Sequence, residues 1–373
     1  MINKTHYWVA ALLIAFTGCT SKQSRVQNAS SLKYATGFTV LHEGKLKRVT
    51  ITYPWPGATE KISYLLVPKG DPIPAEDATT QVIQVPIQKM VCTSTTHIPL
   101  LDYLNQSDAL VGFPGTDYIS SETMRKRIDS QEVVDLGVDK GMNLELLFSL
   151  KPELVMGYTM SSDLGQLKKI KELNIPVVIN AEYLERHPLG RAEWIKFMAL
   201  FFNQEALADS IFNRIESDYL AIQTLTQLTE RPTVLSGIVY GDTWFMPGGQ
   251  NYAARLLNDA GTHYLWQDTD SNGFLELSFE SVYEKGKNAN LWIGVGSYSS
   301  LAEIKAADPR YALFTPFQTG QVYTYNARRG AKGGSEFLEL GYLRPDLILK
   351  DLVKIAHPEL LPDHDLFFHA QLK

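Results

Sequence analysis

Residues 34–70 alternate between apolar and polar positions in three short runs. The runs are Phe38 to Val40, Val49 to Tyr53, and Ile62 to Leu66, and turn residues separate them. A period of two directs alternate side chains to one face of a strand. The pattern therefore predicts a small β meander, which a proline- and acid-rich linker follows up to Thr80.

From Val82 onward, short apolar runs alternate with segments of helical spacing. The runs typical of buried strands are residues 90–93, 109–113, 154–157 and 177–179. Helices are expected to begin at His97, at Asn143 as an N-cap residue, and at Leu164. Strands that alternate with helices favour a parallel sheet with right-handed crossovers.

A long helical stretch separates this set of elements from a second one. Residues 191–227 contain neither proline nor glycine, and apolar residues from Ile211 to Leu225 repeat at helical spacing. We expect a pair of helices here, the second over about 204–227. A second α/β set follows and closes with a helix over about 337–355. Two similar halves joined by a long helix are thus predicted.

The amino terminus has the features of a targeting signal. Lys4 precedes about ten apolar residues, Tyr7 to Phe16, which is too short for a transmembrane helix of roughly 20 residues. The run fits the apolar region of a secretory signal peptide and ends in Phe16-Thr17-Gly18-Cys19. Small residues before a cysteine resemble the bacterial lipobox, so we expect lipidation at Cys19. The alternative is an ordinary signal peptide with an incidental cysteine.

The composition of the chain excludes several classes of protein. The 373 residues are 45% hydrophobic, which excludes a disordered chain, and the net charge of −6 offers no basic face for nucleic acid. Two cysteines cannot form a disulfide framework or a four-cysteine zinc site, and Cys92 lies in an apolar string that suggests a core residue. We find no local signature of an enzyme, such as a Gly-x-Ser-x-Gly elbow or a phosphate-binding loop.

Four passages, taken in order and spacing, resemble the periplasmic binding proteins of ABC importers for iron–siderophore complexes, haem and cobalamin. The resemblance covers roughly residues 82–370. The passages are Gly141 to Glu145 with Leu150 to Val155, Phe245 to Leu257, Leu277 to Val282 before Asn290 to Ile293, and Arg344 to Leu349.

The resemblance implies an α/β fold class with two Rossmann-like lobes, joined by a long backbone helix, and a ligand held between them. The chain would be a monomeric, lipid-anchored protein of the periplasm that delivers its cargo to an ABC permease with a cytoplasmic ATPase. It would catalyse nothing and carry no covalent cofactor beyond the lipid. The expected segments are a signal peptide (1–18), a tether (19–33), the β extension and linker (34–81), the first lobe (82–188), connecting helices (189–230) and the second lobe (231–373).

The cargo expected from the resemblance is an iron complex, either a siderophore or haem. Cobalamin is the alternative within the class. An alternative of another class is a surface-anchored enzyme or adhesion module that reuses the two lobes. The membrane leaflet that carries the anchor and the role of residues 34–70 stay open.

Candidate ligand residues in the first lobe lie in loops that follow predicted strands, where open α/β sheets bind ligands. Thr95 and Thr96 could bond a ligand, although capping of the next helix is the more common role of such residues. His97 could meet a metal, but a lone histidine at a helix start is usually structural. Tyr118 and Tyr158 follow strands, and Tyr158 matches a position where the family often has a pocket aromatic.

Candidates in the second lobe are aromatic and basic. We expect one of Trp244 and Phe245 to line the cleft and the other to pack inward, with Phe274 and Tyr298 as further aromatic contacts. Arg328 and Arg329, in a glycine-rich loop, would pair with an anionic cargo unless they are solvated surface residues. Cobalamin has little need of two guanidinium groups, so this loop favours an anionic iron chelate as the cargo.

Glu145 and Glu280 each begin a predicted helix in corresponding places of the two lobes. The resemblance implies that such glutamates dock on arginines of the permease. Acidic residues in the first turn of a helix are also favoured by the helix dipole, and both roles are compatible.

Overall fold

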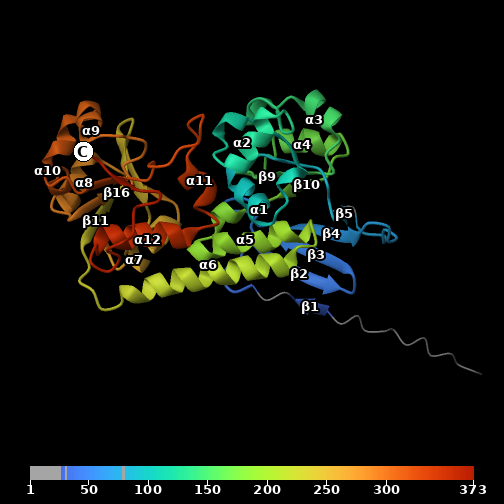
Figure 1. Cartoon of the computed structure of the whole chain (residues 1–373), viewed down its shortest axis with the longest axis horizontal. Coiled ribbons are helices and arrows are strands. Elements are labelled where there is room, and N and C mark those ends of the chain that lie inside the picture. Colours follow the sequence, from blue (N-terminus) through green and yellow to red (C-terminus); the bar gives the residue numbers. More distant parts are fainter. Residues whose placement is uncertain (1–26, 30–31, 78–79) are drawn as a thin grey trace, which may run out of the picture.

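The computed structural model describes residues 27–29, 32–77 and 80–373, and places them in two lobes above a pair of helices (Figure 1). The expected signal peptide, Cys19 and most of the tether lie outside the described residues. Among the described helices, none is long and apolar enough to cross a bilayer.

The predicted meander is part of an amino-terminal sheet with the order β1-β2-β3-β4-β5. Its neighbours are antiparallel except β4 and β5, which are parallel. The run at Val82 therefore completes this sheet and does not begin the first lobe. The strands are β1 (Gln27–Ala29), β2 (Phe38–Glu43), β3 (Leu46–Ile51), β4 (Ile62–Pro68) and β5 (Gln81–Val85).

The first lobe contains a parallel sheet in the order β10-β9-β6-β7-β8. Its strands are β6 (Met90–Cys92), β7 (Leu110–Phe113), β8 (Val134–Asp135), β9 (Leu154–Gly157) and β10 (Val177–Ile179). Its helices are α1 (Ile98–Tyr103), α2 (Glu122–Asp129), α3 (Leu144–Leu150) and α4 (Gln166–Glu172). The amino-terminal sheet covers the β10 edge, where the Gln81 side chain bonds both backbone groups of Val177.

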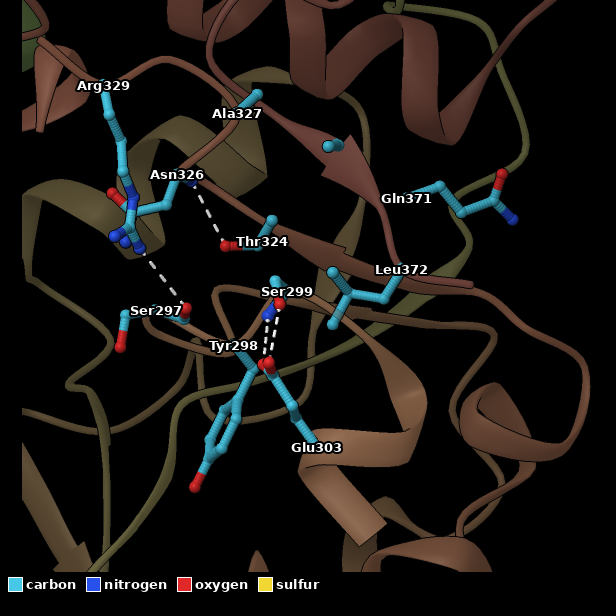
Figure 2. Close-up of a pocket in the computed structure, with 11 residues that line it drawn as sticks. Ser297, Tyr298, Ser299, Glu303, Thr324, Asn326, Ala327, Arg329, Gln371 and Leu372 are labelled. Atoms are coloured by element: carbon cyan, nitrogen blue, oxygen red, sulfur yellow. Dashed lines mark hydrogen bonds between the residues drawn. The ribbon is translucent and has the colours of Figure 1, made fainter. Parts of the chain in front are cut away.

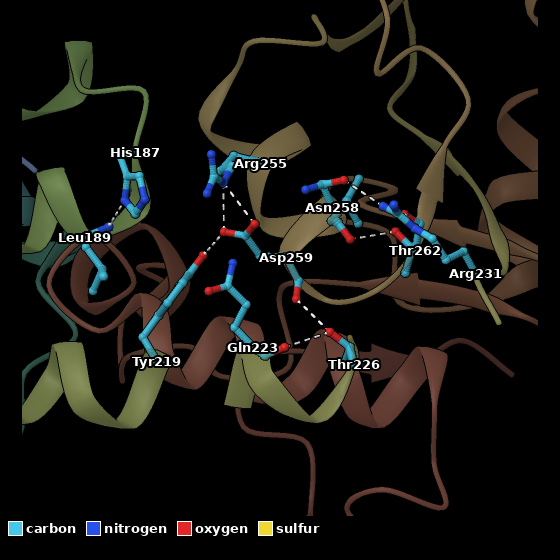
Figure 3. A network of polar contacts seen from close by, with 11 residues as sticks. His187, Leu189, Tyr219, Gln223, Thr226, Arg231, Arg255, Asn258, Asp259 and Thr262 are labelled. Atoms are coloured by element: carbon cyan, nitrogen blue, oxygen red, sulfur yellow. Dashed lines mark hydrogen bonds and ion pairs between the residues drawn. The ribbon is translucent and has the colours of Figure 1, made fainter. Parts of the chain in front are cut away.

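Two helices connect the lobes. Helix α5 (Pro188–Leu200) is buried along nearly its whole length, and α6 (Glu205–Leu225) runs beneath both lobes (Figure 1). The far end of α6 is fixed to the second lobe by the buried Asp259 carboxylate, which accepts from Tyr219 at 2.7 Å and pairs with Arg255 at 2.9 Å (Figure 3). The predicted helix pair is confirmed.

The second lobe has a main sheet in the order β14-β11-β16-β17-β18, in which only β18 is antiparallel to its neighbour. Its strands are β11 (Thr233–Ser236), β14 (His263–Tyr264), β16 (Leu291–Ile293), β17 (Val322–Thr324) and β18 (Ala370–Gln371). A smaller antiparallel sheet consists of β12 (Ile238–Tyr240), β13 (Thr243–Pro247) and β15 (Phe274–Leu277). The helices are α7 (Tyr252–Asp259), α8 (Phe279–Gly286), α9 (Leu301–Ala307), α10 (Thr315–Gln318), α11 (Glu336–Leu340) and α12 (Pro345–Ala356).

The strand orders show that the two lobes repeat one topology. The order β10-β9-β6-β7 in the first lobe corresponds to β17-β16-β11-β14 in the second. In the first lobe β6 lies between β7 and β9, and in the second β11 lies between β14 and β16. Helix α3 precedes β9 and helix α8 precedes β16, and these two strands occupy the same place in their sheets. The two helices are therefore equivalent elements.

The structure differs from the sequence prediction at two breaks. The run from Val234 to Val239 is two strands in two sheets, because Gly237 has a φ of +81° and approaches the Phe245 carbonyl too closely for a side chain. The last helix is divided into α11 and α12, since Pro345 begins a new helix.

Candidate ligand-binding site

The loop after β6 holds its polar side chains against the protein itself. Ser94 accepts the Thr96 N–H as a helix cap, and the Thr96 hydroxyl donates to the carboxylate of Glu182. Thr95 is half-buried in the same turn. Capping and internal bonding thus account for Thr96, and a ligand role for either threonine stays a prediction.

His97 is fully enclosed. Its ring is 0% exposed, and within the described residues neither ring nitrogen has a hydrogen-bond partner. Burial lowers the pKa of His97 to about 3, so the ring is neutral. An enclosed neutral imidazole packs as a core residue and does not reach a ligand at the surface.

Tyr118 and Tyr158 lie on the surface of the first lobe. Tyr118 is 69% exposed in the turn after β7, and Tyr158 follows β9 with its ring edge-on to Tyr183 at 6.3 Å between centroids. Burial, followed by the charge of Asp139, raises the pKa of Tyr158, so its hydroxyl stays protonated and available as a hydrogen-bond donor. Both rings are accessible to a ligand.

Strand β13 directs the neighbouring side chains of Trp244 and Phe245 to opposite faces of its sheet. Trp244 is fully buried, stacks on Trp292 with centroids 5.5 Å apart, and donates its indole N–H to the Ser236 carbonyl at 3.0 Å. Trp244 is therefore the member of the pair that packs inward, because its ring is part of the aromatic core, and it does not line a cleft. Alternation along the strand directs Phe245 to the opposite, half-buried face.

The outer face of this small sheet is aromatic. In the antiparallel register Phe245 is opposite Ile238 and Glu276, and Phe274 is opposite Pro247. Phe274 is 69% exposed, and Tyr240 is 81% exposed with its ring 6.4 Å from that of Phe245. We call Ile238, Tyr240, Phe245 and Phe274 the aromatic face. Sequence reasoning missed Tyr240, although its position two residues after Ile238 assigns it to the same side of the strand.

A polar hollow of about 380 Å³ follows strands β16 and β17 (Figure 2). The predicted residues Tyr298 and Arg329 both line it, and Arg329 donates to the Ser297 carbonyl at 3.4 Å. Glu303, which the sequence did not indicate, accepts from the backbone and the hydroxyl of Ser299 at 2.8 Å each. These bonds, followed by the charge of Arg329, lower the pKa of Glu303. We call this hollow the polar pocket.

The two neighbouring arginines have different surroundings. The Arg328 guanidinium pairs with Glu336 at 2.7 Å and lies over the Phe367 ring at 4.4 Å. Arg329 keeps an exposed guanidinium at the rim of the polar pocket. Of the two, Arg329 is the one with charge available to an anion.

Glu145 and Glu280 occupy the same position in equivalent helices. Each is the second residue after an N-cap, which is Asn143 for α3 and Ser278 for α8. Both are exposed, but Arg310 contacts Glu280 at 3.3 Å beside a second hollow of about 470 Å³. Within the described residues no group of three or more metal-ligating side chains is present.

Comparisons with known proteins agree with this architecture. A family model described as periplasmic binding protein matches residues 90–328. An uncharacterized lipoprotein of Methanocaldococcus jannaschii is 27% identical over 310 residues, which cover 79% of this chain and 72% of that protein.

Solved structures of the same build differ in ligand. A periplasmic haem-binding protein of Vibrio cholerae is 16% identical with a TM-score of 0.55, over 70% of this chain and 99% of that one. A Helicobacter pylori protein, CeuE, solved as a nickel–histidine complex, is 17% identical with a TM-score of 0.57, over 76% and 87% of the two chains. At such identities the likeness concerns the fold. Because the family model matches nearly two thirds of its length, this chain belongs to the periplasmic binding protein family.

Proposed function

We propose that this protein is the substrate-binding component of an ABC importer that captures an anionic metal chelate, such as a ferric siderophore or haem, and presents it to a permease. The supporting observations are the family match and the two-lobe architecture of this chain, with one topology repeated on either side of α5 and α6. The chain acts outside the cytoplasm on a lipid anchor at Cys19. The related protein of Methanocaldococcus jannaschii is itself described as a lipoprotein, which supports this proposal.

The chemistry of the second lobe supports a cargo that combines rings with negative charge. The aromatic face offers a large apolar contact that loses little side-chain entropy on binding. The polar pocket adds one guanidinium, one carboxylate and the hydroxyls of Ser297, Tyr298 and Ser299. A guanidinium recognises carboxylate or phenolate oxygens with directed hydrogen bonds. The carboxylate of Glu303 favours hydroxyl or amine donors on the same ligand.

Direct titration tests the cargo. The protein is mixed with a ferric catecholate siderophore, a ferric hydroxamate siderophore, haem or cobalamin, and binding is followed by calorimetry. A dissociation constant in the micromolar range, about −8 kcal/mol, is expected for at least one of the iron complexes. Tight binding of cobalamin alone would replace the iron proposal with the vitamin. Failure of all four would refute capture of a metal chelate.

The two arginines provide a matched pair of variants. Replacing Arg329 with alanine should weaken an anionic cargo about 10- to 100-fold, because a charge-assisted hydrogen bond of about 1.5–3 kcal/mol is lost. Replacing Arg328 removes the same charge from the next residue but only breaks contacts with Glu336 and Phe367. Its affinity should change less than about threefold. Equal losses in both variants would contradict the assignment of Arg329.

Delivery would use the equivalent glutamates. Glu145 and Glu280 are exposed in the first turns of equivalent helices, so the protein presents one carboxylate per lobe in the same local setting. A permease with one basic group opposite each lobe would fit this arrangement. The partner is thus proposed to be an ABC permease with its ATPase, and the protein to act as a monomer.

A further inference from the structure

A glycine-rich hairpin of the second lobe lies directly on the first lobe. The hairpin is closed by a bridge between Arg329 and Ser335, and the Gly330 N–H donates to the Gly334 carbonyl at 2.8 Å. A Cβ atom on Gly334 would be 2.1 Å from the carbonyl oxygen of Tyr118. A Cβ atom on Gly330 would be 2.7 Å from the Cα atom of Ser120. The two lobes therefore meet backbone to backbone, at a distance that glycine alone permits.

A buried carboxylate fixes the same loop of the first lobe. Glu339 lies in α11, which follows the hairpin and is located between the lobes (Figure 1). Its two oxygens accept the backbone N–H groups of Ser120 at 2.7 Å and Ser121 at 2.8 Å. Glu339 is 2% exposed, so water cannot replace these bonds while the lobes stay in contact.

The first-lobe loop is in turn held from its own side. The Ser121 hydroxyl donates to Asp102 at 2.5 Å, and Ser121 caps helix α2 by accepting the Met124 N–H. A third contact crosses the seam nearby, where Arg344, paired with Asp346, donates to the Tyr103 hydroxyl at 2.8 Å. The loop at residues 118–121 is consequently positioned between two lobes, with polar bonds to each.

The same segment reaches the polar pocket at its other end. Arg329, the first residue of the hairpin bridge, lines the pocket, and the Ser335 hydroxyl donates to Asn326, which lines it too, at 2.8 Å. One continuous stretch of chain thus extends from a cation at the pocket to the backbone of the loop that carries Tyr118. A displacement of the hairpin would move both.

We propose that residues 329–339 are an interlobe latch, which holds the loop at residues 118–121 against the second lobe in the unliganded protein and sets the spacing between Tyr118 and Arg329. In this role Glu339, Gly330 and Gly334 are positioning residues for a site that spans both lobes. The ligand roles of Tyr118 and Arg329 rest on the proposed function, whereas the latch itself is a property of the protein without cargo.

Hydrogen exchange of the unliganded protein, read by mass spectrometry, tests the latch. The wild-type amides at residues 119–121 should exchange slowly, although they belong to a loop, because Glu339 accepts two of them. In Gly334→Ala the added methyl group meets the Tyr118 carbonyl, while the backbone of the hairpin itself needs no positive φ at that residue. Exchange at residues 119–121 and 329–339 should become at least about tenfold faster together.

Matched variants make the result specific. Lys332→Ala changes an exposed residue at the tip of the same hairpin and should leave exchange unchanged, whereas Glu339→Ala should reproduce the effect of Gly334→Ala. Fast exchange at residues 119–121 in the wild type would overturn the latch. So would unchanged exchange in both Gly334→Ala and Glu339→Ala, or an acceleration spread evenly over α5 and α6.

The cargo experiments distinguish the two proposals. If the latch results hold and no chelate binds, the proposed cargo is wrong but the latch stands. If a chelate binds with equal affinity to the wild type and to Gly334→Ala, the latch does not set the spacing of the site. We expect Gly334→Ala to weaken chelate binding about tenfold. The apparent affinity falls in proportion to the fraction of the protein in which the latch is closed.

Discussion

At the scale of single residues, carboxylates that accept consecutive backbone N–H groups recur through the molecule. Glu193 accepts from residues 33, 34 and 35, and Asp351 accepts from residues 367, 368 and 369. Glu339 does the same for the loop at residues 118–121. Each of these side chains accepts two or three N–H donors at once, so it fixes a loop or terminus to a helix.

Glu339 predicts a pH dependence with a definite sign. Burial raises its pKa from the ordinary value near 4.5 to about 7, against the opposing effect of the two serine N–H groups. A folded pKa above the unfolded one favours the folded state at low pH, and this contribution is lost as pH rises from about 4.5 through 7. A difference of this size corresponds to about 3 kcal/mol.

The Glu339→Gln variant isolates this contribution, because its side chain is neutral at every pH. Relative to the variant, the melting temperature of the wild type should fall between about pH 5 and pH 7.5. Scanning calorimetry of both proteins over that range gives the comparison, in which the titration of all other groups cancels. Parallel melting curves would show that the buried carboxyl titrates normally.

At the scale of elements, the amino-terminal sheet braces the connecting helices. The segment at residues 33–37 lies against Glu193 of α5 and against Glu185, which precedes that helix, and the two carboxylates accept its backbone N–H groups at 2.7 to 3.1 Å. The Tyr34 hydroxyl donates to Glu216 of α6 at 2.9 Å, and Phe38 packs on Trp194. This gives a structural role to a region that the sequence left without one.

Removal of the Glu193 carboxylate should therefore be costly. In Glu193→Ala three N–H groups lose their acceptor, that of Ala35 buried and those of Lys33 and Tyr34 partly buried, and the loss in the free energy of unfolding should be about 3–5 kcal/mol. Thermal and urea denaturation measure it. Asp209→Asn is the control, because Asp209 contacts the same Lys196 but is largely exposed, and should cost less than about 0.5 kcal/mol. Equal stability of the two variants would exclude a bracing role.

Element types were largely predictable from sequence because their signals are local. Asn143 caps α3 as expected, and the periodicity of residues 211–225 indicated α6. The failures depend on contacts between distant residues. Gly237 ends β11 because it approaches Phe245, and the strand at Gln81 joins the amino-terminal sheet because β4 is its partner.

The candidate site shows the same limit. Alternation predicts that one of Trp244 and Phe245 is buried, but Trp292 and the register with β12 decide which one. Arg328 and Arg329 are indistinguishable in sequence, and only Glu336 and Phe367 separate their roles. No local pattern indicates Glu303, because its place at the polar pocket follows from the packing of α9.

At the scale of the whole molecule, the lobes are held together at several places besides the connecting helices. Arg191 of α5 lies over the rings of Tyr252 and Tyr342 of the second lobe, at 3.8 and 4.3 Å from their centroids. The latch and the Asp259 network add contacts at other points. Such joints favour a small adjustment on binding over a wide hinge closure. Scattering curves with and without a bound chelate should nearly superimpose, and a marked contraction would contradict this.

The equivalence of α3 and α8 leads to a prediction about transport. Charge reversal of Glu145 and Glu280 together, each to lysine, should abolish cargo uptake in cells, because like charges would then face a basic partner. Affinity for cargo should be unchanged, since neither residue lines the polar pocket or the aromatic face. Reversal of Glu172 and Glu284, which are exposed on α4 and α8, changes the net charge equally and should leave uptake intact.

Single reversals should differ, because Glu280 already forms an ion pair with Arg310, whereas Glu145 has no ion pair among the described residues. Glu145→Lys should therefore cost more uptake than Glu280→Lys. Loss of cargo affinity in the double variant would refute the docking assignment, and loss of uptake in the Glu172 and Glu284 control would reduce it to a general effect of charge.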